Sequence, residues 1–190
     1  MRSLSARPSL WTTCLCLVFA ASSSIPALAQ TKSRPTAATA TPSRPAANGP
    51  KAIGRYDDWT AATHDEGGQL ACYAFTRAVS SLPATPGRGD VVLTVTQRIA
   101  PRDAVAISAG FTYGPSAAVT VTVGSATFQF YTAQRSAFAR DGHAAIAAFG
   151  KGERVVAKSP GPKNTTVTDT FSLRGFSASY AATNKACPPK

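Results

Sequence analysis

Residues 119–131 read VTVTVGSATFQFY, and this stretch decides the fold class. Over 119–123 valine and threonine alternate strictly, which is the two-residue period of a strand with one buried face. Residues 127–131 repeat the alternation with aromatic side chains. Between these runs Gly124-Ser125 places a glycine first in a two-residue turn, so the stretch predicts a β-hairpin.

Segments with the same period lie on both sides of this hairpin and are separated by loops rich in proline and glycine, such as 83–90 and 159–164. Each of these segments is rich in β-branched or aromatic residues and is the length of an ordinary strand. The additional strands are predicted at 69–77, 91–96, 104–109, 154–158 and 167–173.

Two short segments have the signals of helices. Asp141 is a suitable N-cap for a helix over 142–149, and Gly150 follows where a C-terminal glycine is common. Residues 176–186 place their larger side chains at three- and four-residue steps, on one helix face. The sequence therefore predicts an all-β fold, either a mainly antiparallel β-sandwich-like domain or a strongly bent antiparallel sheet, with one short internal helix and a C-terminal helix.

The first 29 residues have the three parts of a secretory signal peptide. Arg2 and Arg7 provide a positive start, residues 10–21 form an apolar run, and Ala27-Leu28-Ala29 is a small-x-small cleavage site. The apolar run is too short to cross about 30 Å of hydrocarbon comfortably. We therefore expect export and cleavage, with no transmembrane segment in the mature chain.

Residues 30–51 form a linker rich in proline, alanine and threonine, and the folded domain is expected over 52–190. The linker contains four basic residues, no acid, and no aromatic or large aliphatic side chain. It has nothing to bury, so it is predicted to be disordered. A solvated spacer is the simpler interpretation, and contact with an anionic surface such as lipid headgroups or acidic glycan is the alternative.

The charge lies mostly at the ends of the chain. The formal net charge is +11, from 20 Lys and Arg against 9 Asp and Glu, yet residues 52–187 hold 13 bases and all 9 acids. Within the domain, basic residues do not cluster with interleaved aromatic residues as single-strand nucleic-acid binding requires. The sequence therefore argues against a nucleic-acid partner.

Cys72 and Cys187 are the two cysteines that remain after the leader. In an oxidising compartment two such cysteines usually pair, and the bridge would close a loop of about 115 positions worth about 4–5 kcal/mol at most. Two free thiols in redox chemistry are the alternative. No Cys-x-x-Cys spacing or basic flank supports it.

The sequence offers little for catalysis or metal binding. His64 is expected in a polar turn with Asp65 and Glu66, whose adjacency prevents easy convergence on one ion. His143 is expected in the first turn of the internal helix. No nucleophile, zinc, phosphate or dinucleotide motif is present, although a scattered Ser/His/Asp triad stays open. We assign no catalytic residue, no metal and no cofactor.

An ordered series of segments resembles the invasion-associated locus B family. The likeness extends from about Tyr56 to Cys187 and depends on the series as a whole rather than on any single motif. It is carried by Tyr56-Asp57-Asp58-Trp59, Ala71-Cys72-Tyr73-Ala74, Gly110-Phe111-Thr112-Tyr113, 119–124 followed by Phe128, Phe149-Gly150-Lys151-Gly152, and 168–176 ending at Cys187.

The resemblance implies a small exported protein of Gram-negative bacteria with a β-sandwich-like fold. It also implies a periplasmic or outer-membrane location and no established enzymatic activity. Many members carry glycine where this chain has Asp57, and many have a cysteine where this chain has Thr63. The second departure leaves Cys72 and Cys187 as partners for each other. No catalytic residue is transferred by the resemblance.

The leading functional hypothesis is a non-enzymatic envelope domain that binds an unknown envelope protein, a lipid or a glycan. Trp59, Tyr73 and Tyr113 are the candidate binding residues, since aromatic side chains and arginine dominate interface hot spots. A core or edge position is the alternative role of each aromatic residue. A contribution to host-cell interaction rests on the family name alone.

Two other functions make different structural demands. A hydrolase acting on envelope polymers requires a pocket that holds His143 or His64 near an acid and a hydroxyl. A chaperone-like stress factor requires an exposed apolar groove or an open sheet edge.

Overall fold

The computed structural model of the chain describes residues 49–189. The predicted signal peptide, most of the predicted linker and Lys190 lie outside the described residues. The first strand, β1 (Lys51–Tyr56), begins at the last residue of the predicted linker, so Lys51 belongs to the sheet.

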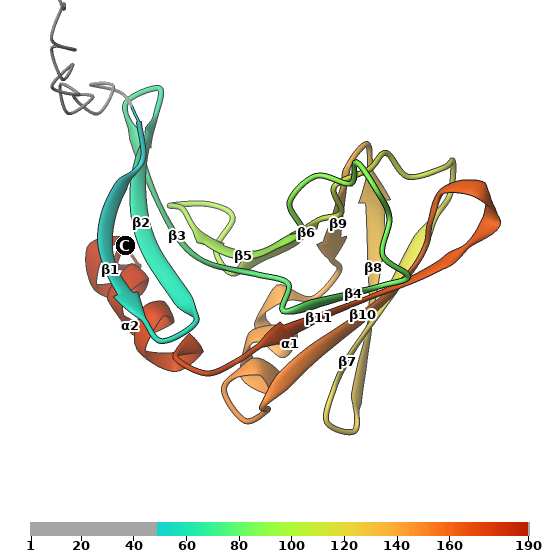
Figure 1. Cartoon of the computed structure of the whole chain (residues 1–190). Coiled ribbons are helices and arrows are strands. Elements are labelled where there is room, and N and C mark those ends of the chain that lie inside the picture. Colours follow the sequence, from blue (N-terminus) through green and yellow to red (C-terminus); the bar gives the residue numbers. More distant parts are fainter. Residues whose placement is uncertain (1–48, 190) are drawn as a thin grey trace, which may run out of the picture. The chain divides into compact units, whose positions relative to one another are not determined.

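The described residues form one antiparallel sheet in the order β1-β2-β3-β5-β6-β9-β8-β7-β10-β11-β4 (Figure 1). This confirms the all-β, mainly antiparallel class, and every predicted strand occurs within two residues of its expected limits. The strands are β1 (Lys51–Tyr56), β2 (Trp59–Glu66), β3 (Gln69–Arg77), β4 (Ser80–Leu82), β5 (Val92–Gln97), β6 (Ala104–Ser108), β7 (Ala118–Val123), β8 (Ala126–Ala133), β9 (Ser136–Ala139), β10 (Arg154–Pro160) and β11 (Thr166–Ser172).

The predicted hairpin is the β7–β8 pair. Val123 pairs with Ala126, and Gly124 in the turn has φ +57°, a left-handed conformation that glycine adopts without strain. Val119 and Val121 are fully buried, whereas the threonine between them is half-exposed. The alternation of the sequence therefore separates an inner face, which carries the core, from an outer face.

Both predicted helices are present, α1 (Gly142–Phe149) and α2 (Phe176–Ala186), together with a short 3-10 turn, η1 (Pro162–Asn164). The Asp141 side chain accepts a hydrogen bond from the backbone N–H of Ala144 at 2.9 Å, which confirms the N-cap. Helix α2 lies beside β1 and β2 (Figure 1). Gly175 precedes α2 with φ +87°, and a Cβ there would meet the Tyr56 carbonyl oxygen at 2.0 Å.

One local prediction was wrong. His64, Asp65 and Glu66 do not form a turn but end strand β2, and the turn consists of Gly67 and Gly68, whose φ angles are +66° and +88°. Two consecutive glycines supply the left-handed conformations that the reversal requires, so the polar residues before them can stay extended.

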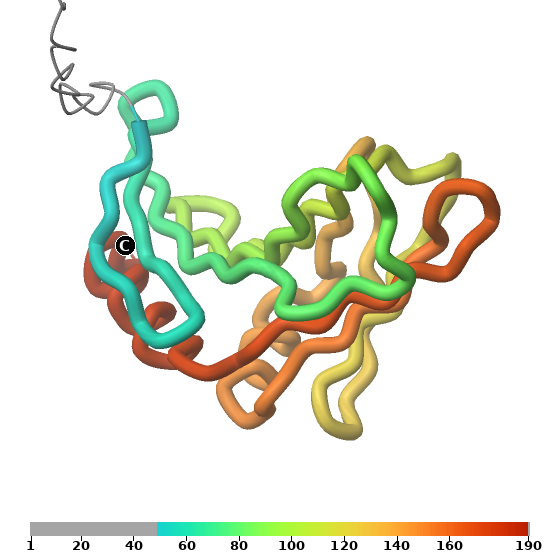
Figure 2. Tube along the Cα trace, in the orientation of Figure 1, coloured from blue at the N-terminus to red at the C-terminus, as the bar shows by residue number. Residues whose placement is uncertain are grey.

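The sheet closes on itself through the junction between β3 and β4. Only Ala78 and Val79 separate these strands, and the two residues bond to different partners. The N–H of Ala78 donates to Val91 at 2.9 Å beside β5, and the N–H of Val79 donates to Thr170 of β11 at 2.8 Å. Figure 2 shows this green segment running beside the red strand β11. In the sheet order, all the strands from β3 through β5 and β11 to β4 therefore form a closed circuit. Strands β1 and β2 extend from this circuit at β3.

Aromatic side chains fill the interior where α2 meets the sheet. The Phe176 ring lies 4.9 Å from the Trp59 ring and 5.5 Å from the Phe149 ring, both edge-on, and it stacks on Tyr180 at 5.7 Å. Centroid distances of this size are favourable for aromatic pairs and add to the free energy of burying each ring. Helix α2 is therefore part of the core rather than a surface addition.

A buried ion pair joins the β4–β5 connection to β11. The Arg88 guanidinium donates two hydrogen bonds of 2.8 Å to the Asp169 carboxylate, and the two side chains are only 6% and 4% exposed. Arg88 also donates to the Ala109 carbonyl at 2.7 Å and lies 5.0 Å over the Phe111 ring, while the Ser81 hydroxyl donates to Asp169 at 2.7 Å. Both charges are thus paired and hydrogen-bonded, as a buried pair requires.

We predict that Arg88→Met lowers the free energy of unfolding by about 3–5 kcal/mol, because it leaves the Asp169 carboxylate buried without its partner. Urea unfolding of the oxidised protein measures the change. The double variant R88M/D169L removes both charges and should recover most of the loss. Equal stability of the single variant and the unchanged protein would contradict the role given to this pair.

Candidate functional site

A groove of about 380 Å³ lies on the outer face of β3 and β5. Because strand side chains alternate between faces, β3 presents Tyr73, Phe75 and Arg77 on the side opposite its buried Ala74. The register places each of them beside an outward residue of β5. The lining residues are Glu66, Tyr73, Phe75, Arg77, Val92, Thr94, Thr96 and Arg98.

Two aromatic rings form one wall of the groove. The rings of Tyr73 and Phe75 lie 6.0 Å apart with a tilt of 40°, and both are half-buried. Burial raises the pKa of the Tyr73 hydroxyl, and the negative charge of Glu66 adds to this increase. The phenol therefore stays protonated at neutral pH and is available as a hydrogen-bond donor beside an apolar surface.

Ion pairs mark the two ends of the groove. Arg98 donates two hydrogen bonds to the Glu66 carboxylate, at 2.7 and 2.8 Å, and Arg77 pairs with Asp90. The hydrogen bond from Arg98 lowers the pKa of Glu66 despite some desolvation, and the same bond raises the pKa of Arg98. Since these side chains are partly or largely exposed, the pairs contribute little to stability.

The three aromatic residues considered for binding do not form one patch. Trp59 is fully buried; its ring nitrogen donates to the Ser172 carbonyl at 2.9 Å. Tyr113 is 9% exposed and packs edge-on against Phe111 at 5.2 Å. Trp59 and Tyr113 therefore lie in the core, which was the alternative to a binding role for each of them. Tyr73 lines the groove together with Phe75, which no sequence pattern had singled out.

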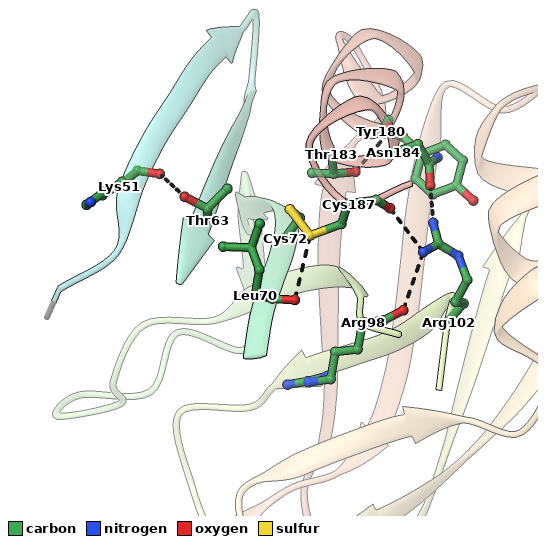
Figure 3. Close-up of a disulfide and its surroundings, with 10 residues drawn as sticks. All are labelled: Lys51, Thr63, Leu70, Cys72, Arg98, Arg102, Tyr180, Thr183, Asn184 and Cys187. Atoms are coloured by element: carbon green, nitrogen blue, oxygen red, sulfur yellow. Dashed lines mark hydrogen bonds between the residues drawn. A yellow bond between two sulfur atoms is a disulfide. The ribbon is translucent and has the colours of Figure 1, made fainter. Parts of the chain in front are cut away.

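The structure joins Cys72 to Cys187 in a disulfide with a Cα–Cα distance of 5.9 Å (Figure 3). Cys72 lies in β3, and Cys187 is the C-cap of α2, where its N–H donates to the Thr183 carbonyl at 2.8 Å. The bond therefore ties the end of α2 to the inner side of the strand that carries Tyr73 on its outer side.

Arg102 reinforces the same junction. Its guanidinium donates to the Cys187 carbonyl at 3.0 Å, to the Asn184 side chain at 2.8 Å and to the Arg98 carbonyl at 3.3 Å (Figure 3). Arg102 therefore connects the backbone of Arg98 to the end of α2. The side chain of Arg98 lines the groove, so this connection also fixes one end of the groove.

His143 has an acid and a hydroxyl nearby, but not in a catalytic order. Its Nδ1 lies 3.1 Å from the Asp103 carboxylate, to which the Tyr180 hydroxyl donates at 2.6 Å and the Gln97 amide also donates. The acid thus lies between the imidazole and the hydroxyl, whereas an activated hydroxyl needs the imidazole in the middle. The imidazole is 85% exposed.

His64 also lacks the required arrangement. It lines a second cavity of about 650 Å³ together with Thr63 and Asp65. Its Nδ1 is buried without a hydrogen-bond partner, so no acid or hydroxyl is bonded to this atom of the imidazole. Across residues 49–189, no group of three or more His, Cys, Asp or Glu side chains is placed to hold a metal ion.

The described residues thus define a disulfide-bonded, antiparallel β domain with a shallow polar and aromatic groove. The family model described as "Invasion associated locus B (IalB) protein" matches residues 59–184, and the chain belongs to this family.

The chain is also similar to the crystal structure of invasion associated protein B from Bartonella henselae. The TM-score is 0.52 at 16% sequence identity, over 70% of this chain and 95% of that chain. At this identity the likeness shows the fold alone. A search of curated proteins found no match. Between residues 49 and 189, no helix is both long and apolar enough to span a membrane.

We predict that replacing both cysteines by serine lowers the free energy of unfolding by about 4–5 kcal/mol at most, because the disulfide closes a long loop in the unfolded chain. Urea unfolding of the oxidised protein, of the reduced protein and of the C72S/C187S variant measures the effect. The reduced protein and the variant should agree, and a variant as stable as the oxidised protein would contradict the prediction.

We predict that Asp103→Asn destabilises the fold at pH 7 by about 1–3 kcal/mol through lost hydrogen bonds to a charged group. Burial alone would raise the pKa of Asp103, but hydrogen bonds from Tyr180, Gln97 and His143 outweigh it and lower that pKa. The ionised carboxylate therefore adds stability above the unfolded pKa, near 4, and this contribution is lost as the pH falls through the lower folded pKa.

The measurement is urea unfolding from pH 7 to pH 2.5 for the unchanged protein and D103N. The difference in stability should shrink toward acid. Asp141→Asn is the matched control, because asparagine also caps helices and the same charge is removed nearby. A constant difference across the pH range would contradict the assignment to Asp103.

Proposed function

We propose that the protein is an exported domain of the bacterial cell envelope, in the periplasm or at the outer membrane, that binds a partner without catalysing a reaction. The groove on the outer face of β3 and β5 is the proposed binding site. Its partner is an envelope protein, lipid or glycan.

The groove is the observation that carries this proposal. It combines two half-buried aromatic rings, Tyr73 and Phe75, with the charged side chains of Arg77, Arg98 and Glu66. Partly exposed aromatic residues beside arginine are the side chains that contribute most of the free energy at protein interfaces. All five side chains project from the outer face of the sheet. Packing in the core therefore does not explain why they lie together.

The proposed location rests on the leader and on the disulfide. Disulfides form and persist in oxidising compartments such as the bacterial periplasm, and the Cys72–Cys187 bond joins β3 to the end of α2. Residues 1–29 have the composition of a signal peptide, which gives an independent reason to propose export.

A non-enzymatic role is proposed because the histidine contacts serve the fold. Asp103 accepts hydrogen bonds from Tyr180 and Gln97, and its backbone N–H donates to Gln97 at 3.0 Å. This carboxylate therefore fixes the β5–β6 connection against α2, and His143 is an exposed neighbour of it. A hydrolase would require a hydroxyl or water held by the imidazole itself.

The chaperone-like alternative draws less support from the sheet edge. Strand β1 is first in the sheet order, but it carries Lys51 and Arg55, and its pairing with β2 is interrupted by a bulge between Ala52 and Gly54. Charged side chains and bulges are common protections against edge-to-edge pairing. The groove, rather than this edge, is the better candidate for recognition.

We predict that a photo-crosslinking phenylalanine analogue at position 75 captures a partner in cells. The tagged protein is irradiated in the intact envelope, and the adducts are purified and identified. The same analogue replacing Lys185, which is exposed on α2, is the matched control. A specific adduct from position 75 and none from position 185 is expected, because only the first position lies in the groove.

An adduct pattern that is identical at both positions would contradict binding through the groove. Capture of nothing at either position, while a known envelope complex is captured in parallel, would contradict the binding function itself.

A further inference from the structure

We propose that the outer face of the sheet binds a carboxylate-bearing glycan strand of the bacterial cell wall. This inference rests on the proposed binding function and names the chemical class of the partner. It also extends the binding surface beyond the groove, across β6, β9 and β8.

The strand register aligns two aromatic sites in one row. Phe75 on β3 pairs with Thr94, Thr94 with Ala106, Ala106 with Phe138, and Phe138 with Tyr131 on β8. All five side chains therefore project from the outer face. With neighbouring strands about 4.8 Å apart, Phe75 and Phe138 are separated by about 14 Å along the sheet.

The second aromatic site repeats the composition of the groove. Tyr131 and Phe138 stack with their centroids 5.5 Å apart and an interplanar angle of 27°. Tyr131 is 45% exposed, and the Arg140 guanidinium lies 5.6 Å over its ring. Each end of the row thus offers two rings with an arginine beside them.

The surface between the two aromatic sites is made only of small side chains. The outward residues of β5 and β6 are short enough for a flat ring to approach the sheet between the aromatic pairs, and all of them are half-buried. They are Val92, Thr94, Thr96, Ala104, Ala106 and Ser108. Threonine and serine hydroxyls there can donate to and accept from the hydroxyls of a sugar.

The charge of this face complements an acidic ligand. The bases that follow the outward alternation of the strands are Arg55, Arg77, Arg98, Arg140, Arg154 and Lys158. Glu66 is the one outward acid on the described strands and is paired with Arg98, while Asp90 is paired with Arg77. Among the described residues, Arg55, Arg140, Arg154 and Lys158 are the outward bases that no ion pair neutralises. Asp65 ends β2 on the side of the strand opposite to Glu66, and the other acids lie in loops and turns, at the α1 N-cap, or in the buried pair with Arg88. A face with this surplus of positive charge attracts carboxylates, and a free guanidinium such as that of Arg140 can bind them bidentately.

The backbone of the face argues for a glycan rather than an extended peptide. Strands β3, β5, β6 and β9 are each hydrogen-bonded on both sides, so they have no free edge to which a peptide could add as a strand. The affinity must come from side chains. Aromatic rings offer an apolar surface to the C–H face of a pyranose, while hydroxyl and guanidinium groups serve its polar substituents.

The first test is calorimetric titration of the purified, oxidised protein with three probes. Tetragalacturonic acid has pyranose rings and carboxylates, maltotetraose has the rings alone, and polyglutamate has the carboxylates alone. We expect the tetragalacturonate to bind at least about tenfold more tightly than either of the others. Equal binding of polyglutamate, or no binding of the tetragalacturonate, would overturn the inference.

Variants locate the site. Arg140→Glu and Arg98→Glu should each weaken tetragalacturonate binding about tenfold, because each places a carboxylate opposite the ligand's own. Lys185→Glu is the matched control: it makes the same charge change on α2, which packs on the other face of β2 and β3. Tyr131→Ala should also weaken binding, with its thermal unfolding measured alongside. Equal losses in all the variants, including K185E, would overturn the assignment of this face.

The source of the glycan and the proposed function are tested separately. The protein should pellet with purified cell-wall sacculi and should be released by tetragalacturonate, whereas preference for heparin over sacculi would overturn the cell-wall assignment. If position 75 captures a protein or lipid in cells while all glycan probes fail, the binding function stands and the glycan inference falls. If both capture and glycan binding fail, both proposals fall.

Discussion

The pairing of Arg88 with Asp169 determines how the sheet of this protein closes. Arg88 belongs to the connection between β4 and β5, Asp169 belongs to β11, and both side chains are nearly fully buried. Because an unpaired charge inside a protein is costly, each residue can be buried only if the other arrives. The pair therefore favours the arrangement in which the chain leaves β5 after β3 and pairs with β11 as strand β4.

Closure gives the sheet two unlike faces. The inner face holds the aromatic cluster around Phe176 and the side of β3 that carries Cys72. The outer face carries short hydroxyl-bearing and aliphatic side chains, charged side chains that are mostly basic, and two aromatic pairs. The disulfide and Arg102 hold the far side of β3 against α2, so the groove is supported by a rigid layer although its own ion pairs are exposed.

Local patterns were sufficient for most elements but not for the site. Strands rich in valine and threonine, and both helices, follow from alternation and capping. Strand β2, which reads WTAATHDE, was not predicted. Ala61 and Ala62 face opposite sides and are both buried, so the strand lacks the apolar and polar alternation that marks the others. Arg88 lies in a Pro- and Gly-rich loop 81 residues from its partner, and no local signal marks it. The row from Phe75 to Tyr131 requires the β6–β9 pairing, which joins strands that are not consecutive.

The packing of α2 against β1, β2 and β3 has a consequence for the order of assembly. The first strands of the domain obtain their cover from its last helix, and Trp59 is buried only when Phe176 has reached it. A chain that emerges N-terminus first, from a ribosome or a membrane channel, therefore cannot complete the packing of these first strands until its last helix has emerged. Strands β1 and β2 therefore stay uncovered, with Trp59 unburied, until nearly all of the domain has emerged.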